Sequence, residues 1–185
     1  IMNTNLFCSE NDSFIPRKKY KGNIPYNEKV YEGECKNDMY NGKGKIFKNG
    51  ELEYNGNWVN DMHNGQGKRF KYGQLEYEGE WNNDLRHGYG KYYEDGQLVY
   101  NGVWKNDLRH GQGKSFKYGQ LEYEGEWVND LWNGQGRTYK NGLLEYDGQL
   151  KNNLRHGIGK IYKNGIFIRN CEFKNDNLYI LVKDI

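Results

Sequence analysis

Residues 51–58 read Glu-Leu-Glu-Tyr-Asn-Gly-Asn-Trp, and residues 65–71 read Gly-Gln-Gly-Lys-Arg-Phe-Lys. In the first segment, Leu52, Tyr54 and Trp58 fall on one face of an extended chain, and the glutamates and asparagines fall on the other. Alternation of aromatic and polar residues with a period of two predicts a half-buried β-strand. The second segment predicts a shorter strand with an aromatic residue near its end. Together the two segments predict a β-hairpin.

The spacing of the glycines indicates that this hairpin recurs along the chain. Twenty-four of the 25 glycines lie at four phases of one 23-residue period, and two of these phases form a Gly-x-Gly pair such as Gly111 and Gly113. A fixed period of this length indicates a repeat array whose units bury surface against their neighbours. Because glycine weakens a strand, we expect the Gly-x-Gly pair to admit a Tyr or Trp ring and to allow the sheet to twist.

The turn dipeptides predict how the strands pair. The Asn-Gly dipeptide at 49–50 is typical of a type I′ turn, in which both residues adopt positive φ. This turn places Lys45 opposite Tyr54, and it puts Phe47 on the same face as Tyr54. The Tyr-Gly dipeptide at 72–73 fits less well, because Tyr resists positive φ, and we expect a bulged or type I turn there.

The connection over residues 59–64 is predicted to be longer than these turns. We expect Met62 to fold back over the aromatic face. We also expect Asn64 and its equivalents His87 and His110 to form a tight turn that tolerates positive φ.

The resulting fold class is all-β: one domain built as an elongated single-layer antiparallel sheet of tandem 23-residue β-hairpins. We expect residues 1–30 to form an N-terminal extension with a partial repeat as a cap, and residues 31–168 to form six repeats. Residues 169–185 are predicted to be a degenerate seventh repeat and a C-terminal cap strand that closes the sheet edge.

Composition excludes several classes of partner. The net charge is +2, from 27 basic and 25 acidic residues, so no strong field attracts nucleic acid. No apolar run is long enough to span a bilayer, and we expect a cytoplasmic protein without a secretory signal. The three cysteines, Cys8, Cys35 and Cys171, lie far apart in the sequence, and we expect them to be reduced.

The residues of an active site are missing from the pattern. His63, His87, His110 and His156 are expected in equivalent turns, where Asn replaces His in other repeats. The Gly-x-Gly pairs fall inside strands and precede no helix, so they are not nucleotide-binding loops. We therefore expect no catalytic residue, no cofactor and no metal site, and the chain itself is not expected to be an enzyme.

Residues 77–81, Tyr-Glu-Gly-Glu-Trp, and residues 83–90, Asn-Asp-Leu-Arg-His-Gly-Tyr-Gly, resemble the MORN (membrane occupation and recognition nexus) repeat. The resemblance covers residues 31–168 as six contiguous repeats, with Cys35 and Leu150 in place of the Trp. It implies an adaptor at cytoskeletal or membrane-associated structures. Related arrays also adjoin phosphatidylinositol-phosphate kinases and SET-domain methyltransferases, so a targeting array of a larger enzyme is an open alternative.

The leading functional prediction is a non-catalytic scaffold that binds a protein partner along an aromatic groove. A one-layer sheet cannot cover both of its faces, so part of the aromatic surface should stay exposed and bind an extended segment or an amphipathic helix. The alternative that the rings pack on one another as the core stays open. The predicted groove residues are Tyr54, Trp58, Tyr77, Trp81, Tyr100, Trp104, Tyr123 and Trp127, with Phe70, Tyr93, Phe116 and Tyr139 beside them.

Two further partners are weighed. A phosphoinositide or membrane-surface site is suggested by a basic residue that recurs at one repeat phase, although acidic residues recur as well. A homodimer through the C-terminal edge is suggested by the strands predicted there. The basic residues with a predicted lipid or anion contact are Lys45, Lys68, Lys91, Lys114, Arg137 and Lys160.

Overall fold

The structure, a computed structural model, describes residues 29–181. These residues form fourteen antiparallel strands in one open sheet, and each strand pairs with its neighbours in chain order. The predicted fold class, an all-β array of tandem hairpins, is thereby confirmed. Most of the predicted N-terminal cap lies outside the described residues. The strands are β1 (Lys29–Lys36), β2 (Met39–Lys48), β3 (Glu51–Val59), β4 (Met62–Lys71), β5 (Gln74–Asn82), β6 (Leu85–Glu94), β7 (Gln97–Lys105), β8 (Leu108–Lys117), β9 (Gln120–Val128), β10 (Leu131–Lys140), β11 (Leu143–Lys151), β12 (Leu154–Lys163), β13 (Ile166–Lys174) and β14 (Asn177–Leu181).

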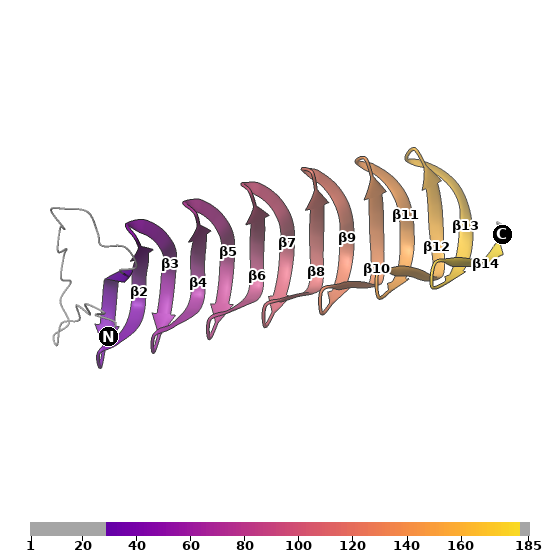
Figure 1. The fold of residues 1–185 in the computed structure, drawn as a ribbon. Helices are drawn as coiled ribbons and strands as arrows, with labels where there is room; N and C mark the ends of the chain where they lie inside the picture. Colours follow the sequence, from indigo (N-terminus) through magenta and orange to yellow (C-terminus); the bar gives the residue numbers. More distant parts are fainter. Residues whose placement is uncertain (1–28, 182–185) are drawn as a thin grey trace. The chain divides into compact units, whose positions relative to one another are not determined.

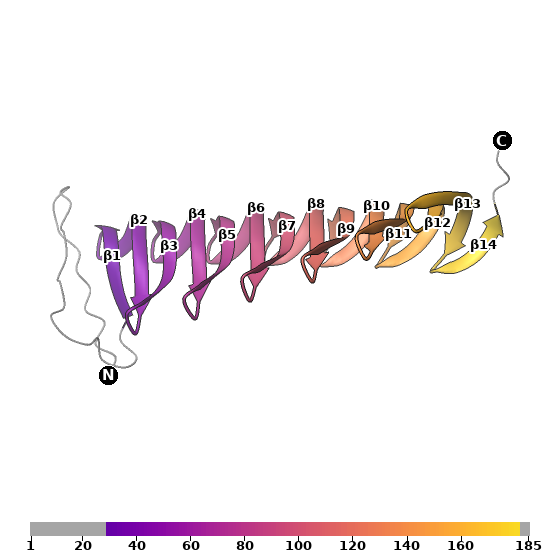
Figure 2. The ribbon, with the colours of Figure 1, turned by 90° about the horizontal axis from the view of Figure 1, so that it is seen from above.

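The chain divides into two compact units, the first ending at Gly88 and the second beginning at Tyr89. Within each unit the hairpins stand side by side in chain order (Figure 1). The view from above shows one layer of strands in each unit (Figure 2). Residues 29–181 include no helix and supply no second layer over either face of the sheet.

The predicted Asn-Gly turns are present. Asn49 and Gly50 have φ values of 53° and 81°, as a type I′ turn requires. The expectation of a different turn at Tyr72-Gly73 was wrong, since Tyr72 has a φ of 52° and Gly73 a φ of 73°. The Tyr72 side chain is 86% exposed, so no packing around it accounts for its left-handed backbone.

The connection at residues 59–64 is also a two-residue turn rather than a longer loop. Asn60 and Asp61 have φ values of 48° and 65°, and β4 starts at Met62. Met62 therefore lies in a strand and does not fold back over the aromatic face. Asn64 likewise lies inside β4, so the predicted turn at the Asn/His phase was wrong. The Asn-Asp dipeptide makes the turn instead.

A β-bulge changes the predicted register beyond the Asn-Gly turn. Phe47 faces Leu52 as expected, but Ile46, and not Lys45, faces Tyr54. Because successive residues of a strand point to opposite faces, Ile46 shares the face of Tyr54, whereas Phe47 lies on the other face with Lys45. We call the first the tyrosine–tryptophan face and the second the lysine face.

The core lies on the tyrosine–tryptophan face. The ring of Tyr100 lies across two facing glycines, and a Cβ atom at Gly113 would overlap its phenol. The Tyr100 hydroxyl donates to the carbonyl of Val103 at 2.9 Å, and the Trp104 Nε1–H donates to the carbonyl of Gly90, in the strand before it, at 3.2 Å. The ring was expected on the Gly-x-Gly pair, but only Gly113 of that pair lies under it, together with Gly102 on the facing strand. Gly111 has a positive φ of 58° and does not contact the ring. The same tyrosine bond recurs at Tyr31, Tyr54, Tyr77, Tyr123 and Tyr146, and the same tryptophan bond at Trp58, Trp81 and Trp127.

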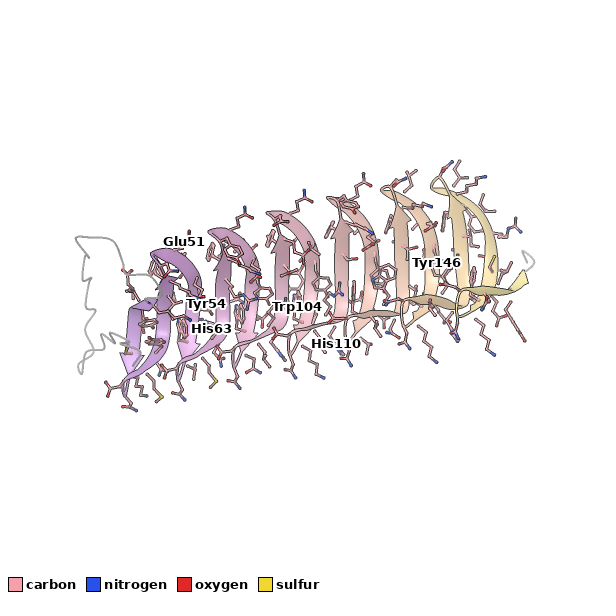
Figure 3. All side chains as sticks on the ribbon, in the orientation of Figure 1. Glu51, Tyr54, His63, Trp104, His110 and Tyr146 are labelled. Atoms are coloured by element: carbon pink, nitrogen blue, oxygen red, sulfur yellow. The ribbon has the colours of Figure 1, made fainter. Side chains whose placement is uncertain are left out.

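A second row of side chains covers the core rings. The ring of His63 lies 3.8 Å from that of Tyr54, and Trp132 stacks on Tyr123 at 4.6 Å. The Arg109 guanidinium lies 4.3 Å from the centre of the Trp127 ring. Figure 3 shows Tyr54 and His63 next to each other on the sheet. We call this row the covering row: Tyr40, His63, Arg86, Arg109, Trp132 and Arg155.

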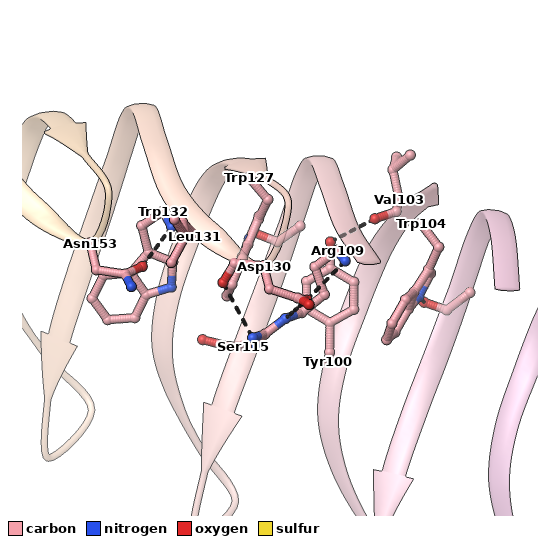
Figure 4. Close-up of polar contacts among 12 residues, drawn as sticks. Tyr100, Val103, Trp104, Arg109, Ser115, Trp127, Asp130, Leu131, Trp132 and Asn153 are labelled. Carbon is pink, nitrogen blue, oxygen red and sulfur yellow. Dashed lines mark hydrogen bonds and ion pairs between the residues drawn. The ribbon is translucent and has the colours of Figure 1, made fainter. Parts of the chain in front are cut away.

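The Asn-Asp turns join each repeat to the one before it. The amide N–H of Tyr40 donates to the Asp61 carboxylate at 2.7 Å, and the Asp61 N–H donates to the Tyr40 carbonyl at 3.1 Å. We call this pair of bonds the turn clamp. Asn153 makes the same clamp on Trp132 (Figure 4). The clamp recurs from Asp84 to His63, from Asp130 to Arg109 and from Asp176 to Arg155.

The first prediction concerns the ring-on-glycine packing. Replacing Gly113 with Val should lower the free energy of unfolding by about 3 kcal/mol or more, because the new side chain must displace the Tyr100 ring. Gly119→Ala is the matched control. Its Cβ would meet no atom within 4 Å, so only the positive φ of 74° costs energy, about 1 kcal/mol. Chemical denaturation measures both, and equal losses would contradict the packing role.

The second prediction concerns pH. Burial lowers the pKa of His63 to about 4 despite the nearby Asp84, whose carboxylate lies 2.9 Å from Nδ1. The unfolded chain takes up this proton at a higher pH than the folded chain does. Stability should therefore fall by about 2–3 kcal/mol as the pH drops from about 6.5 to 4. In His63→Arg, which copies the equivalent Arg86 and Arg109, this part of the loss should vanish from denaturation curves. An unchanged pH profile would contradict the assignment.

Candidate partner-binding surface

The predicted groove residues do not form one surface. The eight tyrosines and tryptophans lie on the tyrosine–tryptophan face, and each is at most 4% exposed. These rings are the core, so their side chains offer almost no area to a partner. The eight rings pack on one another, which was the alternative left open by the sequence.

The other four predicted groove residues lie on the lysine face. Phe70, Phe116 and Tyr139 follow, in their strands, the residues that face the core tyrosines. Tyr93 follows Tyr92, whose ring contacts Trp104 at 6.2 Å, so it too points away from the core. The one-residue bulge at each hairpin separates these four from the rings they were expected to accompany. All four are half-buried.

The covering row and its neighbours form the accessible part of the tyrosine–tryptophan face. In the first unit they border a cleft of about 340 Å³ with Tyr54 and Trp58 at its floor. Charges of both signs line the rim. The Lys29 ammonium lies 3.2 Å from the Glu53 carboxylate, and Arg69 Nε lies 2.6 Å from the carboxylate of Glu76. The cleft thus combines aromatic groups with paired charges.

In the second unit the covering row is bound tightly to the sheet. Arg109 lies between Tyr100 and Trp127, and its Nε donates to the Asp130 carboxylate at 2.8 Å (Figure 4). Ser115, on the same face, is 3% exposed, and its hydroxyl donates to Glu122 at 3.3 Å. These contacts hold the guanidinium in one orientation, which makes the row a preorganised surface.

The lysine face carries a ladder of alternating charges. In the second unit it borders a hollow of about 490 Å³ in which Lys114, Glu124, Arg137 and Asp147 follow one another across the strands. The Tyr139 hydroxyl donates to Glu124 at 2.7 Å. This bond and the Lys114 ammonium hold the pKa of the Glu124 carboxyl below its usual value. The hollow is therefore polar and internally neutralised.

All six residues with a predicted lipid or anion contact belong to this ladder. Lys68 pairs with Glu78 at 3.0 Å, and Lys114 pairs with Glu124 at 2.9 Å. Arg137 lies 3.1 Å from Asp147. The cross-strand neighbours of Lys45 and Lys160 include Asn55 and Asn170. The acidic partners come from the phase one residue beyond the core tyrosine.

Sequence analysis missed the covering row. Its members share one phase and are aromatic, imidazole or guanidinium groups, each of which can stack on a ring. The recurrence of planar side chains at this one repeat phase could have predicted the covering row from the sequence. His63 belongs to this phase, whereas His87, His110 and His156 occupy the next position, so the four histidines are not equivalent.

No three His, Cys, Asp or Glu side chains of residues 29–181 converge as metal ligands would. Over the same range there is no helix long and apolar enough to cross a membrane. Cys171 is free and buried, whereas Cys35 is disulfide-bonded, contrary to the expectation that all the cysteines are reduced.

The amino-acid sequence was compared with curated proteins and with models of protein families. No curated protein matches the chain at a significant level. The family model of the MORN repeat matches residues 31–51, 54–72, 77–98, 100–120, 123–143 and 146–166. These six matches fall on successive hairpins of the sheet and cover well over half of the chain. The chain therefore belongs to the MORN-repeat family.

Proposed function

We propose that the chain is a non-catalytic scaffold that binds a protein partner, an extended segment or an amphipathic helix, across the covering row. MORN repeats are generally protein- or membrane-interaction repeats without catalytic activity. The partner would belong to a cytoskeletal or membrane-associated assembly in the cytoplasm, where the array holds it in place. The surface differs from the predicted groove, because the groove rings are buried.

One observation carries this proposal: the core is constant from repeat to repeat, but the row above it varies. Tyr54, Tyr100, Tyr123 and Tyr146 are buried, and each lies on a pair of facing glycines. Above these rings the covering row changes from His63 to Arg109 to Trp132. Stacking alone would be served by any of these side chains. A row that changes in charge and size along the sheet can instead recognise a partner that is not itself repetitive.

The chemistry of the row indicates what the partner must offer. Arg, Trp, Tyr and His are residue types that often dominate binding energy or bind charge at protein interfaces. Arg109 and Arg155 each keep a guanidinium within bonding distance of a carboxylate, which leaves other N–H groups to donate outward. We expect a partner segment that carries acidic or carbonyl acceptors beside apolar side chains.

The test uses substitutions that the array itself tolerates. Trp132→Arg and His63→Arg copy the Arg found at the same phase of other repeats, so the fold should persist while the row changes. Capture of the chain's partner from the source cells, followed by titration with that purified partner, should show binding weakened about tenfold or more.

A matched control lies on the opposite face. Tyr139→Phe copies Phe70 and Phe116 at the same phase, and it should leave partner binding unchanged. If Tyr139→Phe weakened binding while the covering-row variants did not, the partner would sit on the lysine face and the proposed surface would be wrong.

Direct binding to phosphoinositides is the second candidate, and the charge ladder argues against it. Each paired lysine of the ladder is neutralised by a neighbouring carboxylate. Little positive potential therefore remains to attract an anionic membrane surface. We expect no co-flotation with phosphoinositide vesicles at physiological salt. Glu78→Gln combined with Glu124→Gln should create binding at low salt by releasing Lys68 and Lys114. Strong flotation of the unaltered chain would favour the lipid function.

A further inference from the structure

The turn clamp is an interface that the molecule repeats. At five turns an aspartate or asparagine accepts from a backbone N–H 21 residues earlier, at 2.7–3.0 Å. The same turn residue donates its own N–H back to the carbonyl of that earlier residue. The clamp uses backbone atoms of the earlier strand, so it does not depend on the covering side chain located there.

One turn of this type clamps no residue within the described part of the chain. Asn37 and Asp38, which join β1 and β2, have φ values of 51° and 58°, within the range of the clamping turns. Asp38 is exposed, and within the described residues its carboxylate makes no hydrogen bond or ion pair. β1 is the first strand of the sheet, so its outer edge has no described partner strand.

The other end of the sheet, at β14, presents a residue that such a turn could clamp. Leu178 in β14 occupies the phase of the clamped residues, 23 residues after Arg155. It faces Phe173 just as Arg155 faces Leu150 and His63 faces Trp58. Its N–H and C=O therefore point outward, as those of the clamped residues do. Leu178 is 54% exposed, and β14 is the last strand of the sheet.

We propose that two copies of this chain associate head to tail, with β1 of one copy pairing with β14 of the next and the Asn37-Asp38 turn clamping Leu178. Strands of two kinds alternate along the sheet: those that carry the core Tyr, and those that carry the Gly-x-Gly pair. β1 carries a core Tyr, and β14 stands where a strand of the second kind would follow in this order, with Ile180 at the phase of the first glycine.

A second copy fits these edges better than an unrelated strand would. The interface already exists inside the molecule between successive repeats, and its geometry requires only backbone groups and one carboxylate. Exposed strand edges commonly bind further strands in this way. Because the two contacting surfaces differ, the contact is heterologous and can extend beyond two copies. This inference does not depend on the proposed partner surface.

The test is sedimentation velocity of the 185-residue chain over a range of concentrations. The unaltered chain should form larger species as the concentration rises. Asp38→Ala should weaken association about tenfold or more, because the clamp loses its charged acceptor. Asp38→Asn should retain association, since Asn153 forms the same clamp at 2.7 Å. Asp38 makes no hydrogen bond or ion pair within residues 29–181, so neither substitution should alter the melting temperature.

A mixing experiment decides the orientation. Leu178→Pro removes the outward N–H. At a concentration just sufficient for the unaltered chain to associate, Leu178→Pro and Asp38→Ala should each be monomeric, and the mixing experiment is done at that concentration. Asp38→Ala keeps an intact β14 end, and Leu178→Pro keeps an intact β1 end, so an equimolar mixture should form dimers and nothing larger. Dimers of Asp38→Ala alone would indicate symmetric pairing of β14 edges and would overturn the proposal. A monomeric unaltered chain at every concentration would also overturn it, including the case in which upstream residues occupy the β1 edge.

Discussion

The structure depends on a tyrosine ring lying flat across two facing glycines. A single-layer sheet has no opposing layer to bury its apolar side chains, so each hairpin must build a core on its own surface. Tyr100 does so by covering its own strand pair, where Gly113 leaves the space that its phenol fills. Trp104 then reaches the carbonyl of Gly90 in the preceding strand at 3.2 Å. Burial within a hairpin and bonding to its neighbour thus use the same residues, which explains why the period is kept so strictly.

The last repeat shows why glycine is required two residues after each core tyrosine. The requirement comes from the tyrosine ring and not from the conformation of the backbone. At the phases of Tyr and Gly, β13 carries Arg169 and Cys171. Cys171 faces Gly159 and is fully buried, so its side chain occupies the space that a tyrosine ring fills in the other repeats. Phe173 stands at the Trp phase, with the Arg155 guanidinium 4.6 Å from the centre of its ring. The glycine has been lost where its tyrosine has been lost, as the packing argument requires.

Period, turn dipeptides and alternation were enough to predict the hairpins and their order, because these features act locally. The assignment of faces failed for a local reason as well. One bulged residue before Tyr54 reverses every side chain between the bulge and the turn, so Phe47 and its equivalents moved to the lysine face. Alternation also does not distinguish an aromatic ring that projects from the sheet from a ring that lies flat on glycines. For that reason the buried Tyr and Trp rings were predicted to line an exposed groove. The Asn-Asp turn was readable in principle, since both residues tolerate positive φ.

Separating the core from its cover lets the surface change without loss of stability. Residues 70–81 and 116–127 have the same twelve-residue sequence, and both contribute the same buried Tyr and Trp. Yet Arg86 lies over Tyr77 at 6.0 Å, whereas Trp132 stacks on Tyr123 at 4.6 Å. Two identical cores therefore carry different chemistry towards a partner. Because the turn clamp bonds to the backbone of the covering residue, any side chain that can stack is accepted there, and recognition can vary while the sheet stays the same.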